Sequence, residues 1–169
     1  MNSTQRYDLF LSIYLSTRGF AFILAEGAQN PVDWGITEAR GSEKNRKCMR
    51  MIDALVRRYR PDVLILEDTG HRSSWRSRRV QRLNAEICVF AQEYGIPVTR
   101  ASREDVRAAF HPHGAETKEE IAEVISERIP VLARYVPPTR KPWMTEDARM
   151  ALFDAAALLF TATTQNIEG

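Results

Sequence analysis

A short, uninterrupted apolar segment at residues 63–66 constrains the fold more than any other part of the sequence. Its residues, Val-Leu-Ile-Leu, are followed at once by Glu67 and a second acid. A strand that is apolar on both faces must be covered by helices on both faces, as in a sheet with parallel strands. Helical patterns flank it at 48–59 and 80–94, where apolar residues recur every three or four positions. A further strand-like segment at 97–99 completes a β-α-β-α-β order, which predicts parallel strands.

The segment before this unit predicts antiparallel strands, and the segment after it predicts helices. Apolar runs at 9–15 and 19–26 are separated by a short polar turn, and a third run follows at 32–37. These runs indicate three antiparallel strands. Ser102 and Thr117 are residue types that cap helix N-termini, so we expect one helix to begin after each of them.

The composition is typical of one globular domain, and we expect a single domain over residues 1–169. Hydrophobic residues make up 44% and charged residues 27%, which excludes a disordered or disulfide-rich chain. No apolar stretch reaches the roughly 18 residues that a membrane span needs. Two cysteines, Cys48 and Cys88, lie on the apolar positions of predicted helices and indicate packing thiols. Because the start also lacks the pattern of a secretory signal, we expect a cytoplasmic protein without membrane contacts.

The charge is concentrated in one part of the chain. The net charge is only +2, but residues 40–82 hold 13 of the 24 lysines and arginines and five acids, a local charge of +8. Within this part, the segment 71–82 has no acid. It is predicted to be a loop that contacts nucleic acid, because it combines arginines with an aromatic side chain that can stack on bases. The residues expected to bind are Arg72, Trp75, Arg76, Arg78, Arg79 and Arg82.

Four short motifs occur in a fixed order, at 12–21, 60–67, 114–118 and 153–157. In order and spacing they resemble the RuvC-type Holliday-junction resolvases, a family of the RNase H-like superfamily. The resemblance implies an α/β fold with a mixed five-stranded sheet, three antiparallel strands followed by two parallel ones, flanked by helices. In that fold the first and fourth strands lie side by side.

The resemblance also implies a function and a set of site residues. The family cuts branched DNA as a homodimer, using two Mg²⁺ or Mn²⁺ ions held by carboxylates of the first strand, fourth strand and last helix. Glu67 and Asp154 match two of these carboxylates, and Lys118 matches a lysine near the scissile phosphate. Trp75 follows the fourth strand, where the resolvases carry an aromatic that wedges into the junction. An equal alternative is that Trp75 anchors its loop by partial burial.

Tyr14 occupies the position where the family has its first-strand aspartate. A phenol of pKa about 10 is neutral at pH 7 and does not bridge two magnesium ions as a carboxylate does. The companion of Asp154 one helical turn earlier is Ala151, so a second expected carboxylate is absent. Asp147, in the last helix expected at 146–163, lies two turns away from Asp154. This distance is too long for the two carboxylates to share a metal, and Asp147 is better explained as a first-turn helix acid.

Each matched residue also has an ordinary structural explanation. Glu67 is either a site residue or one half of a buried salt bridge to an arginine. Asp154 interrupts an apolar helix, so it is either a site residue or a polar anchor to a neighbouring element. Lys118 either contacts phosphate or pairs in solvent with Glu119 or Glu123.

Two functional interpretations remain open from the sequence. The first is a RuvC-like protein that binds branched or duplex DNA but has a weakened or lost two-metal site. The second is an active, divergent magnesium-dependent endonuclease that uses Glu67, Asp154 and another carboxylate. Tyr14 favours the first, because losing a metal-bridging carboxylate removes much of the transition-state stabilisation. Sugar-kinase-like and actin-like ATPases have a related topology but need a glycine-rich phosphate hairpin, which residues 14–17 do not provide.

Overall fold

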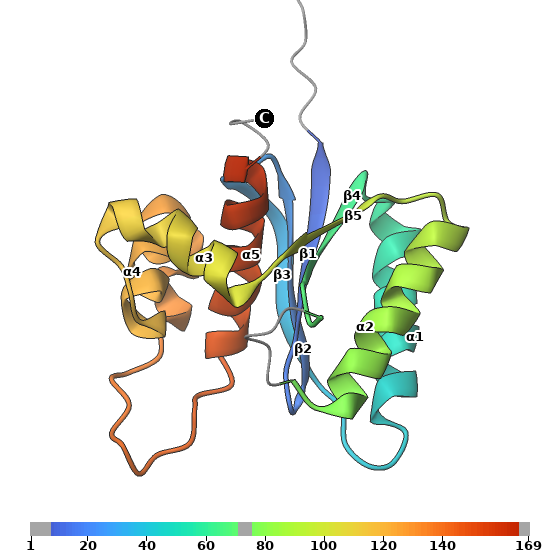
Figure 1. The fold of residues 1–169 in the computed structure, drawn as a ribbon, viewed down its shortest axis with the longest axis horizontal. Coiled ribbons are helices and arrows are strands. Elements are labelled where there is room, and N and C mark those ends of the chain that lie inside the picture. The colour runs from blue at the N-terminus through green and yellow to red at the C-terminus, as the bar shows by residue number, and fades with distance from the viewer. Residues whose placement is uncertain (1–7, 71–75, 166–169) are drawn as a thin grey trace, which may run out of the picture.

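The computed structural model describes residues 8–70 and 76–165. Five strands form one sheet in the order β3-β2-β1-β4-β5 (Figure 1). The pairs β1–β2 and β2–β3 are antiparallel, whereas β1–β4 and β4–β5 are parallel. The strands are β1 Leu9–Leu15, β2 Gly19–Glu26, β3 Asn30–Glu38, β4 Val63–Glu67 and β5 Val98–Ala101. This sheet confirms the predicted RNase H-like fold, including the adjacent first and fourth strands.

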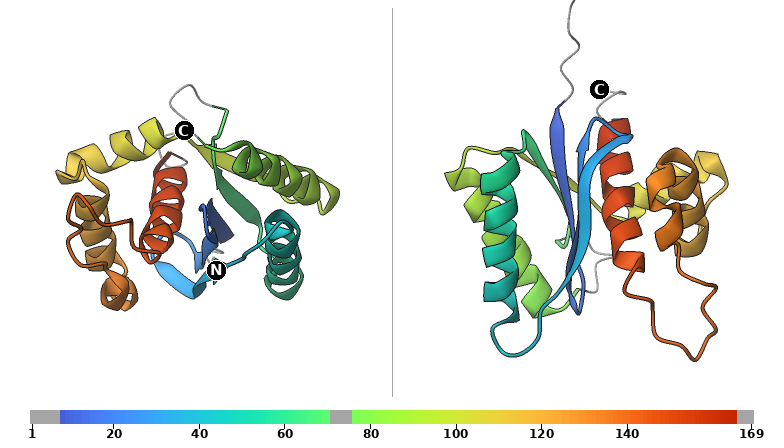
Figure 2. Two further views of the ribbon diagram at one scale, coloured as in Figure 1. Left: turned by 90° about the horizontal axis from the view of Figure 1, so that it is seen from below. Right: turned by 180° about the vertical axis from the view of Figure 1, so that it is seen from behind.

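Helices cover both faces of the sheet, as the apolar β4 predicts. Figure 2 shows α1 and α2 on one face and α5 on the other, with α3 and α4 packed outside α5. The helices are α1 Lys44–Tyr59, α2 Arg78–Glu93, α3 Arg103–Phe110, α4 Lys118–Arg128 and α5 Met150–Gln165, with short 3-10 helices η1 His111–His113 and η2 Pro130–Tyr135. Among the described residues, no helix is long and apolar enough to cross a membrane.

The two faces of β1 follow from its alternating residues. Leu11, Ile13 and Leu15 pack with the apolar side chains of α1 and α2. Phe10 and Tyr14 pack instead with those of α5. Both sets are buried, so β1 is the central strand of two hydrophobic cores.

Helix α5 lies close to the sheet because it is rich in alanine. Ala155, Ala156 and Ala157 are all buried, and small side chains let the helix backbone approach β1. The hydroxyl of Ser12 in β1 donates a hydrogen bond of 2.7 Å to the carbonyl oxygen of Ala155. This bond fixes the height of α5 along β1, and therefore the height of the neighbouring Asp154.

The starts of α5 and α2 differ from those expected. α5 begins at Met150 rather than at residue 146, because Asp147 and Arg149 form a turn before it. α2 begins at Arg78, so the expected arginine loop is shorter at its C-terminal end, and Ser77 caps the helix. Both cysteines are free, but Cys48 is buried whereas Cys88 is only half-buried beside Arg100.

A capping box holds the start of α3 in its helical conformation. The Ser102 hydroxyl accepts a hydrogen bond from the backbone N–H of Asp105, whose carboxylate accepts one from the backbone N–H of Ser102. Ser102→Ala should lower the free energy of unfolding by about 1 kcal/mol, because this capping box is lost. Ser126→Ala is the control, since that hydroxyl donates only to Glu123 of its own helix. Equal urea midpoints for the two variants would contradict the capping role.

Candidate functional site

The site lies at one end of the sheet, where β1 and β4 finish. Ser12 pairs with Ile65 in the parallel register, so Tyr14 and Glu67 reach the same level two residues further along their strands. Both point to the face that α5 covers, because side chains two residues apart share a face. The sequence expectation that these two residues are neighbours is consistent with this register.

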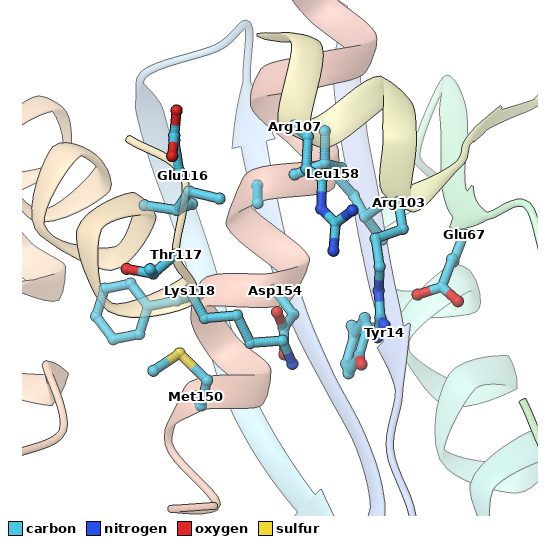
Figure 3. Close-up of a pocket in the computed structure, with 14 residues that line it drawn as sticks. Tyr14, Glu67, Arg103, Arg107, Glu116, Thr117, Lys118, Met150, Asp154 and Leu158 are labelled. Atoms are coloured by element: carbon cyan, nitrogen blue, oxygen red, sulfur yellow. The ribbon is translucent and has the colours of Figure 1, made fainter. Parts of the chain in front are cut away.

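Asp154 projects toward the same place from α5. Figure 3 shows Tyr14 between Asp154 on one side and Glu67 on the other. The Asp154 side chain is only 15% exposed. Burial raises its pKa from 3.8 to about 6, although the attraction of Lys118 opposes the rise. The contact with Lys118 makes Asp154 a polar link between α5 and α4.

Lys118, the first residue of α4, neutralises this carboxylate. Its Nζ lies 3.3 Å from Oδ2 of Asp154 and 3.1 Å from Oε1 of Glu146. The same ammonium lies 5.8 Å from the centre of the Tyr14 ring. Burial lowers the pKa of Lys118, but Asp154, Tyr14 and Glu146 together raise it above its ordinary value, so the group stays protonated. Lys118 thus pairs with Asp154 and Glu146, and not with Glu119 or Glu123 as the structural alternative expected.

Arg76 neutralises the other carboxylate. Its Nε lies 3.8 Å from Oε1 of Glu67, and both side chains are about 15% exposed. Nη1 donates a 3.1 Å hydrogen bond to the Tyr14 hydroxyl, and Nη2 donates to the carbonyl oxygen of Leu15. The guanidinium also lies 5.1 Å from the centre of the Tyr14 ring. The arginine partner that the sequence left open for Glu67 is therefore Arg76.

Tyr14 separates the two ion pairs and carries no charge itself. Its side chain is buried, and burial together with the charge of Asp154 raises the pKa of the phenol. Glu67 pairs with Arg76 on one side of the ring, and Asp154 pairs with Lys118 on the other. Each carboxylate has a counterion supplied by the protein.

These donors do not fit a two-metal centre. Two magnesium ions about 4 Å apart require several shared carboxylates and open positions for water and substrate. Among residues 8–70 and 76–165, no three histidine, cysteine or acidic side chains gather closely enough to hold a metal ion. The phenol of Tyr14 stands between the remaining carboxylates, and Arg76 and Lys118 already supply the positive charge that metal ions would bring.

Asp147 is placed differently from the sequence expectation. It is not a first-turn acid of the last helix, because it lies before α5. Its carboxylate accepts hydrogen bonds from the Arg149 side chain at 2.9 and 2.7 Å. These bonds lower its pKa to about 2. The acid of this segment that reaches the site is instead Glu146, which the sequence did not single out.

A cavity of about 240 Å³ opens beside the site. Tyr14, Asp154 and Lys118 form one end, and apolar side chains of α4 and α5 form the wall. Arg103 and Arg107 reach over it from α3 (Figure 3). No hydrogen bond or ion pair joins either guanidinium to another described residue. The sequence signal for these two arginines was only their spacing of four residues, which is also that of an ordinary solvated helix face.

The arginines expected to bind nucleic acid fall into separate groups. Arg76 is directed into the site, and Arg79 donates to the carbonyl of Ser16 and the side chain of Asn45. Arg78 and Arg82 are exposed on α2. The other two, Arg72 and Trp75, lie outside the described residues. The structure therefore leaves Arg78 and Arg82 as the described members of this group with exposed side chains.

No protein-family model matches the sequence, and no curated protein matches it either. Solved structures do match the backbone. Thermus thermophilus RuvC in complex with Holliday junction substrate aligns with a TM-score of 0.66 at 16% identity, covering 95% of this chain and 96% of that one. This chain has the RuvC fold.

Two further structures support the RuvC fold. A second Thermus thermophilus RuvC structure has a TM-score of 0.63 at 17% identity, and the alignment covers 94% of this chain and 96% of that one. The yeast mitochondrial Holliday junction resolvase Ydc2 has a TM-score of 0.66 at 14% identity. That alignment covers 96% of this chain and 80% of the Ydc2 chain. The RuvC fold thus extends over nearly the whole chain.

The raised pKa of Asp154 predicts how stability depends on pH. A carboxyl whose pKa is higher in the folded state contributes stability below its unfolded value, near 3.8, which is lost as pH rises through about 6. The wild type should therefore lose stability relative to Asp154→Asn as pH rises from 4 to 7, by on the order of 2 kcal/mol. Urea unfolding of both proteins in chelator-treated buffer measures this difference. A difference that does not change with pH would show that Asp154 is not held in an unfavourable ionised state.

Proposed function

We propose that this protein binds branched DNA through a RuvC-like cleft and does not cut it by two-metal chemistry. The observation that carries the proposal is the pairing of Glu67 with Arg76 and of Asp154 with Lys118 around the neutral Tyr14. Tyr14 replaces the oxygen ligand that both metals would share, and the two cations satisfy the carboxylates that remain. Mg²⁺ or Mn²⁺ is then not required for the function.

The same ion pairs favour DNA binding without metal. Two bare carboxylates at the bottom of a cleft would repel a phosphate backbone, and a nuclease overcomes this repulsion with its metal ions. Here Arg76 offsets the charge of Glu67, and Lys118, which also pairs with Glu146, offsets that of Asp154. Arg103 and Arg107, which have no hydrogen bond or ion pair among the described residues, then add positive charge above the cavity, where a phosphate can approach.

Branched DNA is the proposed ligand because one similar structure is described as a RuvC complex with Holliday junction substrate. A four-way junction contains symmetry-related strands, and a two-fold homodimer would present two equivalent clefts to them. We therefore include a homodimer in the proposal. A cytoplasmic location is also included, as the sequence led us to expect.

A cleavage assay separates this proposal from a divergent endonuclease. Wild type should leave a labelled four-way junction uncut in Mg²⁺ or Mn²⁺. Tyr14→Asp combined with Arg76→Gln restores an oxygen ligand and removes the guanidinium that blocks it, so this double variant should gain Mn²⁺-dependent nicking. Adding Glu67→Gln should abolish the gain.

Cleavage of the junction by the wild type would contradict the proposal. Metal-dependent cleavage by the wild type that Glu67→Gln abolishes would overturn the non-cutting proposal and establish the endonuclease alternative. Cleavage by the wild type that survives Glu67→Gln would contradict the assignment of this site as well.

DNA binding should depend on salt through the α3 arginines. Each lost phosphate contact lowers the slope of log affinity against log salt by about 0.9 for duplex arms. Arg103→Ala with Arg107→Ala should therefore reduce the slope by about one to two. Arg57→Ala is the matched control, because Arg57 lies near the opposite end of the strands and pairs with Asp53. Fluorescence anisotropy at several salt concentrations measures the slopes, and equal slopes in all three proteins would place the DNA elsewhere.

Arg78 and Arg82, the exposed arginines of α2, provide a second test of where DNA binds. If DNA extends from the cleft along the start of α2, then Arg78→Ala with Arg82→Ala should also lower the slope by about one to two. An unchanged slope would limit the DNA footprint to the α3 side of the site.

A further inference from the structure

The loop of residues 136–149, which connects η2 to α5, carries the most exposed large apolar side chain of the described residues. Trp143 is 78% exposed, and the next such residue, Val89, is 56% exposed. The neighbouring Met144 is 47% exposed. Figure 1 shows this loop extending away from the helices below α4 and α5. An indole this open to water offers a flat face that a ligand can cover.

The loop is held in place beside the site. Glu146 pairs with Lys118 at 3.1 Å, and its carbonyl oxygen accepts a bond of 3.4 Å from Arg18. Asp147 pairs with Arg149 at 2.7 Å. Since Glu146 comes only three positions after Trp143, the backbone of Trp143 lies within about 10 Å of chain length from a residue of the site. A ligand in the cleft can therefore reach Trp143.

A turn and three prolines restrict the backbone around Trp143. The backbone N–H of Met144 donates a 2.9 Å hydrogen bond to the carbonyl oxygen of Lys141, which closes a turn around the tryptophan. Pro137, Pro138 and Pro142 each fix one backbone angle of the loop. Restricting the loop before binding reduces the entropy that is lost when a ligand covers the indole.

The charge around the indole indicates the kind of ligand. Residues 134–144 contain Arg134, Arg140 and Lys141 but no acid. The Lys141 ammonium lies 5.3 Å from the centre of the Trp143 ring. The two acids further along the loop, Glu146 and Asp147, are paired with Lys118 and Arg149. A flat aromatic surface beside basic residues that form no ion pair within the described chain suits a ligand that combines flat rings with negative charge, which is the chemistry of a nucleic-acid strand. An apolar protein partner would not require this charge.

We propose that Trp143 stacks on an unpaired or unstacked base where DNA branches, and so gives the protein a preference for branched over fully paired DNA. The inference rests on the proposed function, because the DNA must occupy the cleft next to the loop. In an intact duplex both faces of each base are covered by neighbouring bases, so Trp143 has no free face to contact. At a branch point a base face becomes available.

The experiment compares affinities for a four-way junction and for a duplex of the same length in wild type, Trp143→Ala and Trp143→Phe. Trp143→Ala should weaken junction binding about tenfold, as expected for one lost base–aromatic stack, and leave duplex binding unchanged. Trp143→Phe should keep most of the preference. Tyr94→Ala, which removes an exposed aromatic side chain from the C-terminal end of α2, is the matched control and should change neither affinity.

A second measurement reports the stack directly. The fluorescence of 2-aminopurine at the branch point should be quenched by wild type and much less by Trp143→Ala. Equal loss of junction and duplex affinity, or no loss of either, would overturn the inference but leave the proposed function intact. If Trp143→Ala changes self-association but not junction affinity, the inference is also overturned, because the loop would then contact another copy of the protein and not DNA. If wild type binds neither DNA, the proposed function itself fails.

Discussion

Two carboxylates between the sheet and α5 must be neutralised, and this requirement organises the rest of the site. Glu67 ends a strand that is buried on both faces, and Asp154 lies in a nearly apolar helix. Ionised groups in such places are costly unless an opposite charge lies close by. The chain supplies Arg76 from the segment before α2 and Lys118 from the start of α4. These contacts join the sheet, α4, α5 and the loop before α5 into one unit.

The RuvC fold is therefore compatible with a metal site, whereas the side chains at that position are not. The fold brings the ends of β1 and β4 together beneath α5, a geometry that suits a shared metal pair. The residues at that point form ion pairs with a phenol between them, a geometry that suits a permanently neutral surface. Because the counterions belong to the protein, the cleft keeps its charge balance whether or not divalent metal is present. Under the proposed function, DNA binding is retained while the catalytic power of the metals is lost.

Most of the fold could be predicted from the sequence, because it depends on local patterns. The boundaries of β1 and β2 were predicted to the residue, since apolar runs and the turn between them are read locally. The proximity of Tyr14 and Glu67 followed from the order of the elements. The role of Arg76 did not, because its contacts with Tyr14 are 62 residues away in sequence. The start of α5 was wrong by four residues, because the Asp147 side chain bonds the backbone of Arg149 in place of helical hydrogen bonding.

The most direct test of the account is the anomalous diffraction of crystals soaked in Mn²⁺ at neutral pH. We predict no manganese peak between Glu67 and Asp154 in the wild type, with the Arg76 and Lys118 side chains still in contact with their carboxylates. Crystals of Tyr14→Asp combined with Arg76→Gln provide the positive control, in which a peak is expected at that position. A manganese peak in the wild type, bound by both Glu67 and Asp154 with Arg76 or Lys118 displaced, would contradict the claim that the protein's own cations replace the metal ions.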